Sequence, residues 1–155
     1  MSTARDVMNS TFQTLRPEMS LVDAVDFFRL SSAEQNRLIF GMAVMDDEGR
    51  LAGMLSMYDI LLLIRPKHTE VWGMMEDIDV SGLLEAAGER ATTLRVEDIM
   101  TVDVVTVKPE AHILTILDTM IRKHIRRIPV MNHDKMEGIV YLSDLYNYLV
   151  KGWSQ

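Results

Sequence analysis

An internal repeat constrains this chain more than any other feature. Three segments of its first half return, in the same order, in its second half. The pairs are ARDVM (4–8) with VEDIM (96–100), TLRPEMSLVDAVD (14–26) with TVKPEAHILTILD (106–118), and GMLSMYDIL (53–61) with GIVYLSDLY (138–146). The first copy holds extra residues, mostly around Ser31 to Asn36. A unit of this length that occurs only twice is too long and too rare for a solenoid, so it predicts a pseudo-symmetric pair of supersecondary units. Neither unit is expected to bury its own core alone.

Apolar periodicity predicts the same order of elements in both copies, namely strand, helix, strand, strand, helix. In the second copy the elements are expected at Val104–Val107, Ile113–Ile121, Ile128–Met131 and Gly138–Leu142, with a closing helix that Asp144 opens. In the first copy they are expected at Phe12–Leu15, Leu21–Phe28, Met42–Met45, Leu51–Leu55 and Tyr58–Ile64. The predicted fold class is therefore α/β, with a first repeat at 1–65, a linker at 66–92 and a second repeat at 93–155.

The linker carries an acidic stretch, Glu76 to Asp79, followed by the pattern of a short helix. Ser81 is expected to cap the start of this helix, because a serine oxygen accepts the unpaired N–H groups of a first turn. Gly88 is expected to end the helix, since glycine is common just past a helix C-terminus.

The charge balance restricts the classes of ligand. The chain has 16 basic and 23 acidic residues and a net charge of −7. Binding to nucleic acid or to an anionic membrane depends on an excess of lysine and arginine, so neither is expected. No apolar run approaches the roughly 20 residues that span a bilayer, and no signal peptide is expected. The chain has no cysteine, which favours a reducing, cytoplasmic location.

The sequence contains no recognisable catalytic constellation. The four histidines show no ligand spacing to one another, so no metal site is expected. No G-x-S-x-G, P-loop or Rossmann glycine pattern occurs, and Gly53 and Gly138 are isolated glycines at strand starts. An enzyme is therefore not expected.

In their order and duplication, the motifs resemble those of the paired CBS domain, also called the Bateman module. The matching features are D-[IV]-M at the head of each copy, T-[LV]-x-P with the helix behind it, H-I-R-R-I-P-V-M at 124–131, and G-h-h-x-x-x-D, where h is apolar. The resemblance implies a tandem CBS-domain pair whose sheets pack about a pseudo-twofold axis and leave two clefts. It implies AMP, ADP, ATP or S-adenosylmethionine as effector, with no required cofactor and no catalysis.

The stretch GMLSMYDILLLI at 53–64 has two interpretations. From the residues alone, Asp59 caps the helix that begins at Tyr58 or Ile60, and Ser56 is an ordinary strand residue. The resemblance implies instead that Asp59 accepts hydrogen bonds from ribose hydroxyls and that Ser56 supports it. A carboxylate suits this role because it accepts two hydroxyl donors at once.

The resemblance adds residues of the second copy to the Asp59 cleft. They are Thr106, Ala111, Ile125, Arg126 and Arg127. Small Ala111 suits a base that lies against it, and the arginines suit phosphates because a guanidinium meets phosphate oxygens bidentately. Without the resemblance, Thr106 is a strand former beside a proline. The basic group from Arg122 to Arg127 is then a positive complement to a helix C-terminus.

The second cleft, around Asp144, departs from the pattern. Tyr141 stands where the first copy has Ser56, and its ring would fill the space of a ribose. The other residues that the resemblance implies for this cleft are Thr14, Met19, Ile39, Phe40 and Ser143. This set is bulkier and carries no positive charge, so the Asp144 cleft is expected to be the weaker site.

Two functions stay open. The first is a regulatory sensor that binds an adenine nucleotide and thereby changes its affinity for a partner enzyme or transporter. The second is a ligand-free protein interaction module that uses the pair as a scaffold and the acidic linker as its surface. Ser56 and Asp59 favour the first function, whereas Tyr141 and the uncharged Phe40 favour the second. The resemblance also implies a homodimer.

Overall fold

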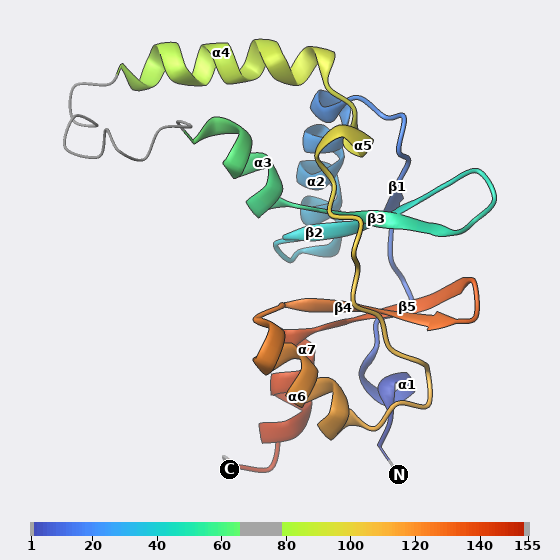
Figure 1. The fold of residues 1–155 in the computed structure, drawn as a ribbon. Coiled ribbons are helices and arrows are strands. Elements are labelled where there is room, and N and C mark those ends of the chain that lie inside the picture. The colour runs from blue at the N-terminus through green and yellow to red at the C-terminus, as the bar shows by residue number, and fades with distance from the viewer. Residues whose placement is uncertain (1, 66–78, 154–155) are drawn as a thin grey trace. The chain divides into compact units, whose positions relative to one another are not determined.

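The computed structural model of the chain describes residues 2–65 and 79–153 (Figure 1). In chain order the elements are α1 (Ala4–Val7), β1 (Thr14–Leu15), α2 (Leu21–Gln35), β2 (Gly41–Met45), β3 (Leu51–Ser56), α3 (Met57–Ile64), α4 (Val80–Thr93), α5 (Val96–Ile99), α6 (Ile113–Lys123), β4 (Arg127–Asn132), β5 (Lys135–Tyr141) and α7 (Leu142–Val150). An α/β chain with two repeats is thereby confirmed. The motif pattern does not predict α1 and α5, the short helices at the heads of the repeats.

The chain folds into two compact units, and each contains segments of both repeats. The α6–α7 unit comprises Met1–Thr14, Met45–Ala52 and Asp103–Gln155. The α2–α4 unit comprises Leu15–Val44 and Gly53–Val102. The head of the first repeat, with α1, therefore packs with the second repeat, and the head of the second repeat, with α5, packs with the first. No helix of the described residues is long and apolar enough to cross a membrane.

Main-chain hydrogen bonds hold each head helix in its unit. They run from Val96 N–H to the Met19 carbonyl (2.9 Å), Glu97 N–H to the Pro17 carbonyl (3.0 Å), Ala4 N–H to the Ala111 carbonyl (2.9 Å) and Arg5 N–H to the Pro109 carbonyl (3.2 Å). The donors are the first two N–H groups of α5 and of α1, which have no partner inside a helix. The T-[LV]-x-P segment of each repeat, with the residues just after it, thus supplies carbonyl acceptors for the head helix of the other repeat.

The aspartate of each D-[IV]-M motif closes its own head helix. Thr3 N–H donates to Asp6 Oδ2 at 2.7 Å, and Arg95 N–H donates to Asp98 Oδ2 at 2.8 Å. An acidic side chain at the third helical position that reaches back to the N-cap N–H forms half of a capping box. The capping bond therefore explains the aspartate in both motifs.

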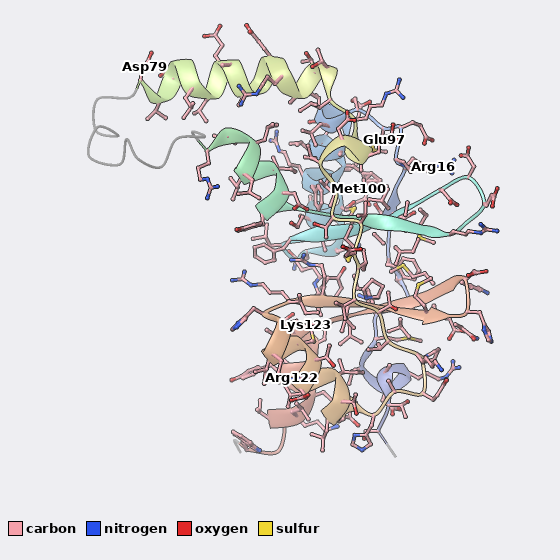
Figure 2. The ribbon with its side chains drawn as sticks, viewed as in Figure 1. Arg16, Asp79, Glu97, Met100, Arg122 and Lys123 are labelled. Carbon is pink, nitrogen blue, oxygen red and sulfur yellow. The ribbon has the colours of Figure 1, made fainter. Side chains whose placement is uncertain are left out.

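The methionine of each D-[IV]-M motif lies over the glycine of a G-h-h motif. Met100 follows α5 beside β3 (Figure 2), and Met54 and Thr101 exchange main-chain N–H to carbonyl bonds of 2.9 and 2.8 Å. A Cβ atom on Gly53 would lie 2.6 Å from the Thr101 carbonyl oxygen and 2.9 Å from Met100 Sδ. Glycine is required here because the two segments approach more closely than a side chain allows.

The α6–α7 unit repeats this contact. Asn9 and Ile139 exchange main-chain bonds of 2.8 and 3.0 Å. A Cβ atom on Gly138 would lie 2.7 Å from Met8 Sδ and 3.0 Å from the Asn9 carbonyl oxygen. Gly53 and Gly138 therefore lie where the head segment of one repeat packs against a strand of the other repeat. This arrangement is called the exchange of head segments.

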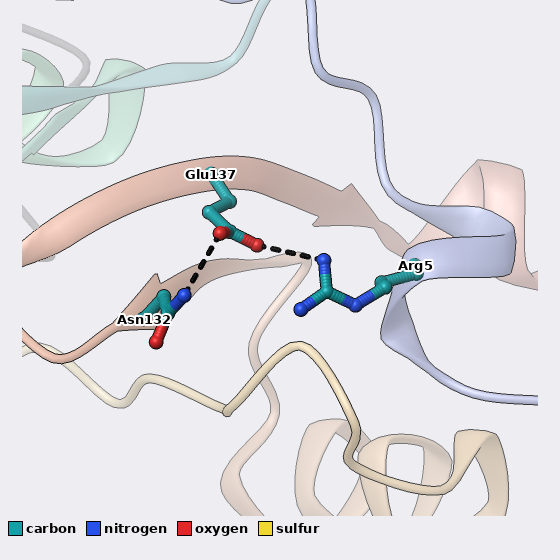
Figure 3. A network of polar contacts seen from close by, with 3 residues as sticks. All are labelled: Arg5, Asn132 and Glu137. Atoms are coloured by element: carbon teal, nitrogen blue, oxygen red, sulfur yellow. Dashed lines mark hydrogen bonds and ion pairs between the residues drawn. The ribbon is translucent and has the colours of Figure 1, made fainter.

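A polar network adds to the hold on α1 (Figure 3). Arg5 Nη1 pairs with Glu137 Oε1 at 3.0 Å, and Asn132 Nδ2 donates to Glu137 Oε2 at 3.0 Å. The Arg5 side chain is 53% exposed and that of Glu137 20%, so solvent screens the ion pair and its contribution stays at or below about 1 kcal/mol. The main-chain bonds and burial therefore dominate the attachment of α1.

The strands form a three-stranded sheet in the order β1-β2-β3 and an antiparallel pair, β4-β5. The β4-β5 register runs from Arg127 opposite Tyr141 to Asn132 opposite Lys135. The core of the α6–α7 unit contains Ala4 and Val7 of the first repeat together with Ile116, Met120, Ile128, Val130, Val140 and Leu145 of the second. The core of the α6–α7 unit is thus built from both repeats.

The predicted strand at Val104–Val107 is wrong. Only Val107 pairs, in an isolated parallel bridge to Val130. Its N–H donates to the Pro129 carbonyl at 3.0 Å, and its carbonyl accepts from Met131 N–H at 2.8 Å. The β-branched run therefore makes one rung of a ladder and not a strand.

The predicted limits of the linker helix are also wrong. Asp79, not Ser81, is the N-cap of α4, and its Oδ1 accepts Ser81 N–H at 3.1 Å. The helix continues through Gly88 to Thr93. A glycine inside a helix costs only about 1 kcal/mol, and α4 packs against α2 and α3, with Ala87 buried. Residues 76–78 of the acidic stretch lie outside the described residues.

The extra residues of the first copy lengthen its first helix, which runs to Gln35 and not, as predicted, to Phe28. Helix α2 has 15 residues and α6 has 11. Both end at a residue in the left-handed conformation, Asn36 with φ 50° and His124 with φ 54°. The insertion therefore adds about one turn and preserves the way in which the helix ends.

Substitution of Gly53 by alanine tests the close contact with the head segment. Gly53→Ala is expected to lower the free energy of unfolding by about 1–3 kcal/mol, because the added Cβ meets the Thr101 carbonyl. Gly88→Ala is the control, since a methyl group added there would have no atom within 4 Å. This change is expected to stabilise α4 by roughly 0.5–1 kcal/mol. Urea unfolding of the two variants measures both values, and equal stability of Gly53→Ala and the parent chain would contradict the packing account.

Candidate functional site

The candidate site is the start of α3, where β3 ends at Ser56. Ser56 N–H and Ser56 Oγ both donate to Asp59 Oδ2 at 3.0 Å, and Asp59 N–H donates to Ser56 Oγ at 3.2 Å. These reciprocal bonds form a capping box. The cap interpretation of Asp59 is therefore right in kind, but α3 begins at Met57, with Ser56 as its N-cap and Asp59 at the third helical position.

The second oxygen of Asp59 has a different environment. From the described residues, Asp59 Oδ1 accepts one hydrogen bond, from Thr101 Oγ1 at 3.4 Å. Hydrogen bonds between oxygens are usually 2.5–3.0 Å long, so this is a weak one. The cap thus engages Oδ2 fully and leaves Oδ1 with acceptor capacity on a partly buried side chain.

Sequence reasoning missed Thr101. It comes directly after the D-I-M motif and belongs to the exchanged head segment of the second repeat. Its counterpart in the first repeat is Asn9, whose Oδ1 accepts Thr11 N–H at 2.9 Å in a local turn. The sequence signal that could have pointed to Thr101 is Gly53, because Thr101 pairs with the next residue, Met54, two residues before Ser56.

The equivalent motif of the second copy has a different cap. Tyr141 is the N-cap of α7 and makes no side-chain capping bond, and Asp144 lies at the third helical position. A phenol on a rigid ring cannot fold back onto its own first turn as a serine hydroxyl does. The two motifs therefore differ in structure at the position where they differ in sequence.

The residues just before β2 and β4 each bond to the first turn of a helix. The Phe40 carbonyl accepts Met57 N–H at 2.8 Å, and the Arg126 carbonyl accepts Leu142 N–H at 2.8 Å. Phe40, which the resemblance assigned to the Asp144 cleft, is therefore bonded beside Ser56 in the α2–α4 unit.

The other predicted residues divide between the units. Ile39 and Met19 belong to the α2–α4 unit with Ser56 and Asp59. The residues of the α6–α7 unit are Thr14, Thr106, Ala111, Ile125, Arg126, Arg127, Ser143 and Asp144. Thr106 and Arg126 are exposed, whereas Ala111, Ile125 and Arg127 are partly buried.

Arg122 and Lys123 of the same basic group lie at the end of a helix. Arg122 and Lys123 occupy the last turn of α6 (Figure 2). Arg122 Nε also donates to Asp118 Oδ2 at 2.9 Å, one turn earlier. Positive charge in a last turn complements the helix dipole.

Within residues 2–65 and 79–153, no group of three or more histidine and acidic side chains is placed to hold a metal ion. One of the four histidines, His68, lies outside the described residues.

Comparison with known proteins identifies the repeats. The family model described as CBS domain matches residues 4–66 and 96–151, which is more than half of the chain. The CBS domain of a CBS domain containing membrane protein from Sphaerobacter thermophilus is 30% identical, with a TM-score of 0.68 over 95% of this chain and 87% of that one.

Two further relatives share the fold at lower identity. CBSX2 from Arabidopsis thaliana is 22% identical, with a TM-score of 0.73 over 96% of this chain and 94% of that one. A structure of CBSX2 in complex with AMP gives a TM-score of 0.71 at 20% identity, over 99% and 100% of the two chains. MJ1225 from Methanocaldococcus jannaschii, a proposed archaeal homolog of g-AMPK, is 21% identical over 97% of this chain. The chain spans only 44% of the length of MJ1225.

Substitution of Ser56 tests the cap. Ser56→Ala is expected to lower the free energy of unfolding by about 0.5–2 kcal/mol, because it removes the acceptor for Asp59 N–H and a donor to Asp59 Oδ2. Ser81→Ala is the control, an exposed serine in the first turn of α4. It should change stability by less than about 0.5 kcal/mol. Chemical unfolding compares the two, and an unaffected Ser56→Ala would exclude the capping role.

Proposed function

The chain belongs to the CBS domain family, and on that premise we propose that it is a regulatory module that binds an adenine nucleotide through Asp59. The observation that carries the proposal is that the two oxygens of this carboxylate have different roles. Oδ2 caps α3, and Oδ1 keeps acceptor capacity. The AMP bound to CBSX2 supports the class of ligand.

The chemistry of Asp59 suits a ribose. A carboxylate accepts hydrogen bonds from hydroxyl groups without itself needing a donor, and bonds to a charged acceptor are roughly twice as strong as neutral ones. The capping box fixes the side chain in advance, so a ligand would not have to order it. The cap and the ligand interpretations of this residue are therefore compatible.

We propose Thr106, Ala111, Ile125, Arg126 and Arg127 as further contacts of the same nucleotide, on the strength of the family resemblance. Arg126 and Arg127 would serve the phosphates, because a guanidinium offers two parallel donors. The Asp144 motif, with Thr14, Met19, Ile39, Phe40 and Ser143, is proposed as a weaker site, since Tyr141 replaces the capping serine.

The proposed role is regulatory and not catalytic. A bound nucleotide changes the affinity for a partner enzyme or transporter only to the extent that it binds two arrangements of the chain differently. The ligand is an effector, AMP, ADP, ATP or S-adenosylmethionine, in a cytoplasmic setting. If no nucleotide binds, the alternative is a ligand-free interaction module.

A homodimer is part of the proposal. Exposed apolar side chains on α3 and α7 support it, namely Tyr58, Leu61 and Leu62 on α3 and Tyr146 on α7. Sedimentation velocity should give a dimer for the parent chain, and Leu61→Glu should shift it toward monomer because it buries a charge. Leu30→Glu, on an exposed position of α2, should leave the dimer intact. A monomeric parent chain would refute this part of the proposal.

Thermal unfolding with AMP, ADP, ATP, S-adenosylmethionine and NAD tests the nucleotide. A ligand at 100 times its Kd adds about 2.7 kcal/mol, which raises Tm by several degrees for a chain of this size. Asp59→Ala should abolish the rise, whereas Asp26→Ala, at an exposed carboxylate on α2, should keep it. The proposal fails if no nucleotide raises Tm, or if Asp59→Ala retains the full rise.

A further inference from the structure

Three donors reach the Asp59 carboxylate from the described part of the chain. Ser56 N–H and Ser56 Oγ donate to Oδ2 at 3.0 Å, and Thr101 Oγ1 donates to Oδ1 at 3.4 Å. The donors Ser56 and Thr101 and the acceptor Asp59 all belong to the α2–α4 unit. Thr101 is the only one of the donors that comes from the second repeat.

The number of open acceptor sites on Asp59 limits how many hydroxyl groups of a ligand can bond to it. A carboxylate offers about four lone-pair sites, two on each oxygen. The bonds from Ser56 fill both sites on Oδ2, and the Thr101 hydroxyl takes one of the two on Oδ1. One site is left, yet a ribose presents two neighbouring hydroxyl donors. A ribose that donates both hydroxyls must therefore displace one of the existing bonds.

Of the three bonds, the one from Thr101 is the easiest for a ribose hydroxyl to displace. At 3.4 Å it is the longest of the three, whereas the bonds from Ser56 are also part of the capping box that starts α3. Breaking the cap would cost helix stability. A threonine hydroxyl can instead rotate away without any change of backbone, and Thr101 is an exposed residue, so water can accept the released hydroxyl.

We propose that Thr101 competes with the second ribose hydroxyl for Asp59 Oδ1 and so sets the preference of the site between ribose and 2′-deoxyribose. This inference rests on the proposed nucleotide function of Asp59. A ribonucleotide displaces the Thr101 hydroxyl and loses affinity by doing so. A 2′-deoxynucleotide, with one hydroxyl at this carboxylate, uses the open site and leaves Thr101 in place.

The backbone of Thr101 keeps the hydroxyl within reach of Asp59. Its N–H and carbonyl are both bonded to Met54, at 2.8 and 2.9 Å. Asn9, at the equivalent place in the first repeat, directs its side-chain oxygen to Thr11 N–H. The Asp144 motif therefore has no threonine hydroxyl at the position that corresponds to Thr101.

Calorimetric titration with AMP and with 2′-deoxy-AMP tests the inference on the full chain. Thr101→Val keeps the shape of the side chain and removes the hydroxyl. It is expected to bind AMP about two- to fivefold more tightly, the lower part of the range for one hydrogen bond, because the bond that no longer has to be broken is long. Its affinity for 2′-deoxy-AMP should change less than twofold. Thr101→Ser restores the donor and should bind both ligands as the parent chain does.

Two variants control for other effects. Thr115→Val, at an exposed position of α6, should leave both affinities unchanged. Thr101→Ala also removes the hydroxyl and gives the same test if Thr101→Val does not fold.

Unchanged or weaker AMP binding by Thr101→Val would overturn the inference, and so would an equal gain for both ligands. In each of these cases the nucleotide function stands if Asp59→Ala abolishes binding. If the parent chain binds neither ligand, the proposed function fails and the inference fails with it.

Discussion

The main-chain pairing of Thr101 with Met54, together with its counterpart between Asn9 and Ile139, is the contact on which the rest of the structure depends. Each pair joins the head segment of one repeat to a strand of the other. The glycine beside each pair permits the close approach. Because the head segments also bury Ala4 and Val7 in the α6–α7 unit and Val96 in the α2–α4 unit, neither repeat has a complete core of its own. The chain therefore folds as an interdependent pair.

This exchange also brings the second repeat to the candidate site. Met54 lies two residues before Ser56, so the segment that pairs with it carries Thr101 to within 3.4 Å of Asp59. The capping box and the ligand contact then use different oxygens of one carboxylate. In the second copy of the motif, the N-cap residue Tyr141 makes no side-chain capping bond. The asymmetry between the two motifs is thus local to a few side chains, within one shared fold.

The repeat and its periodicities were enough to predict most of the elements, because helices such as α6 and strands such as β4 have long, regular apolar patterns. They were not enough for Val104–Val107, where β-branched residues form only one rung, or for Gly88, where packing of α4 outweighs the cost of a helical glycine. The exchange was not predicted either, because main-chain pairs such as Thr101 with Met54 depend on no particular side chain. Gly53 and Gly138 were its only trace in the sequence. The capping role of Asp59 was predictable from local spacing, whereas its contact with Thr101 depends on the exchange.

The central claim is that one carboxylate oxygen caps α3 while the other binds ribose. A crystal structure of the chain with AMP tests it most directly. The account predicts ribose hydroxyl oxygens within about 3 Å of Asp59 Oδ1, with both bonds from Ser56 to Oδ2 retained. AMP bound with its ribose away from Asp59, or bound only at the Asp144 motif, would contradict it.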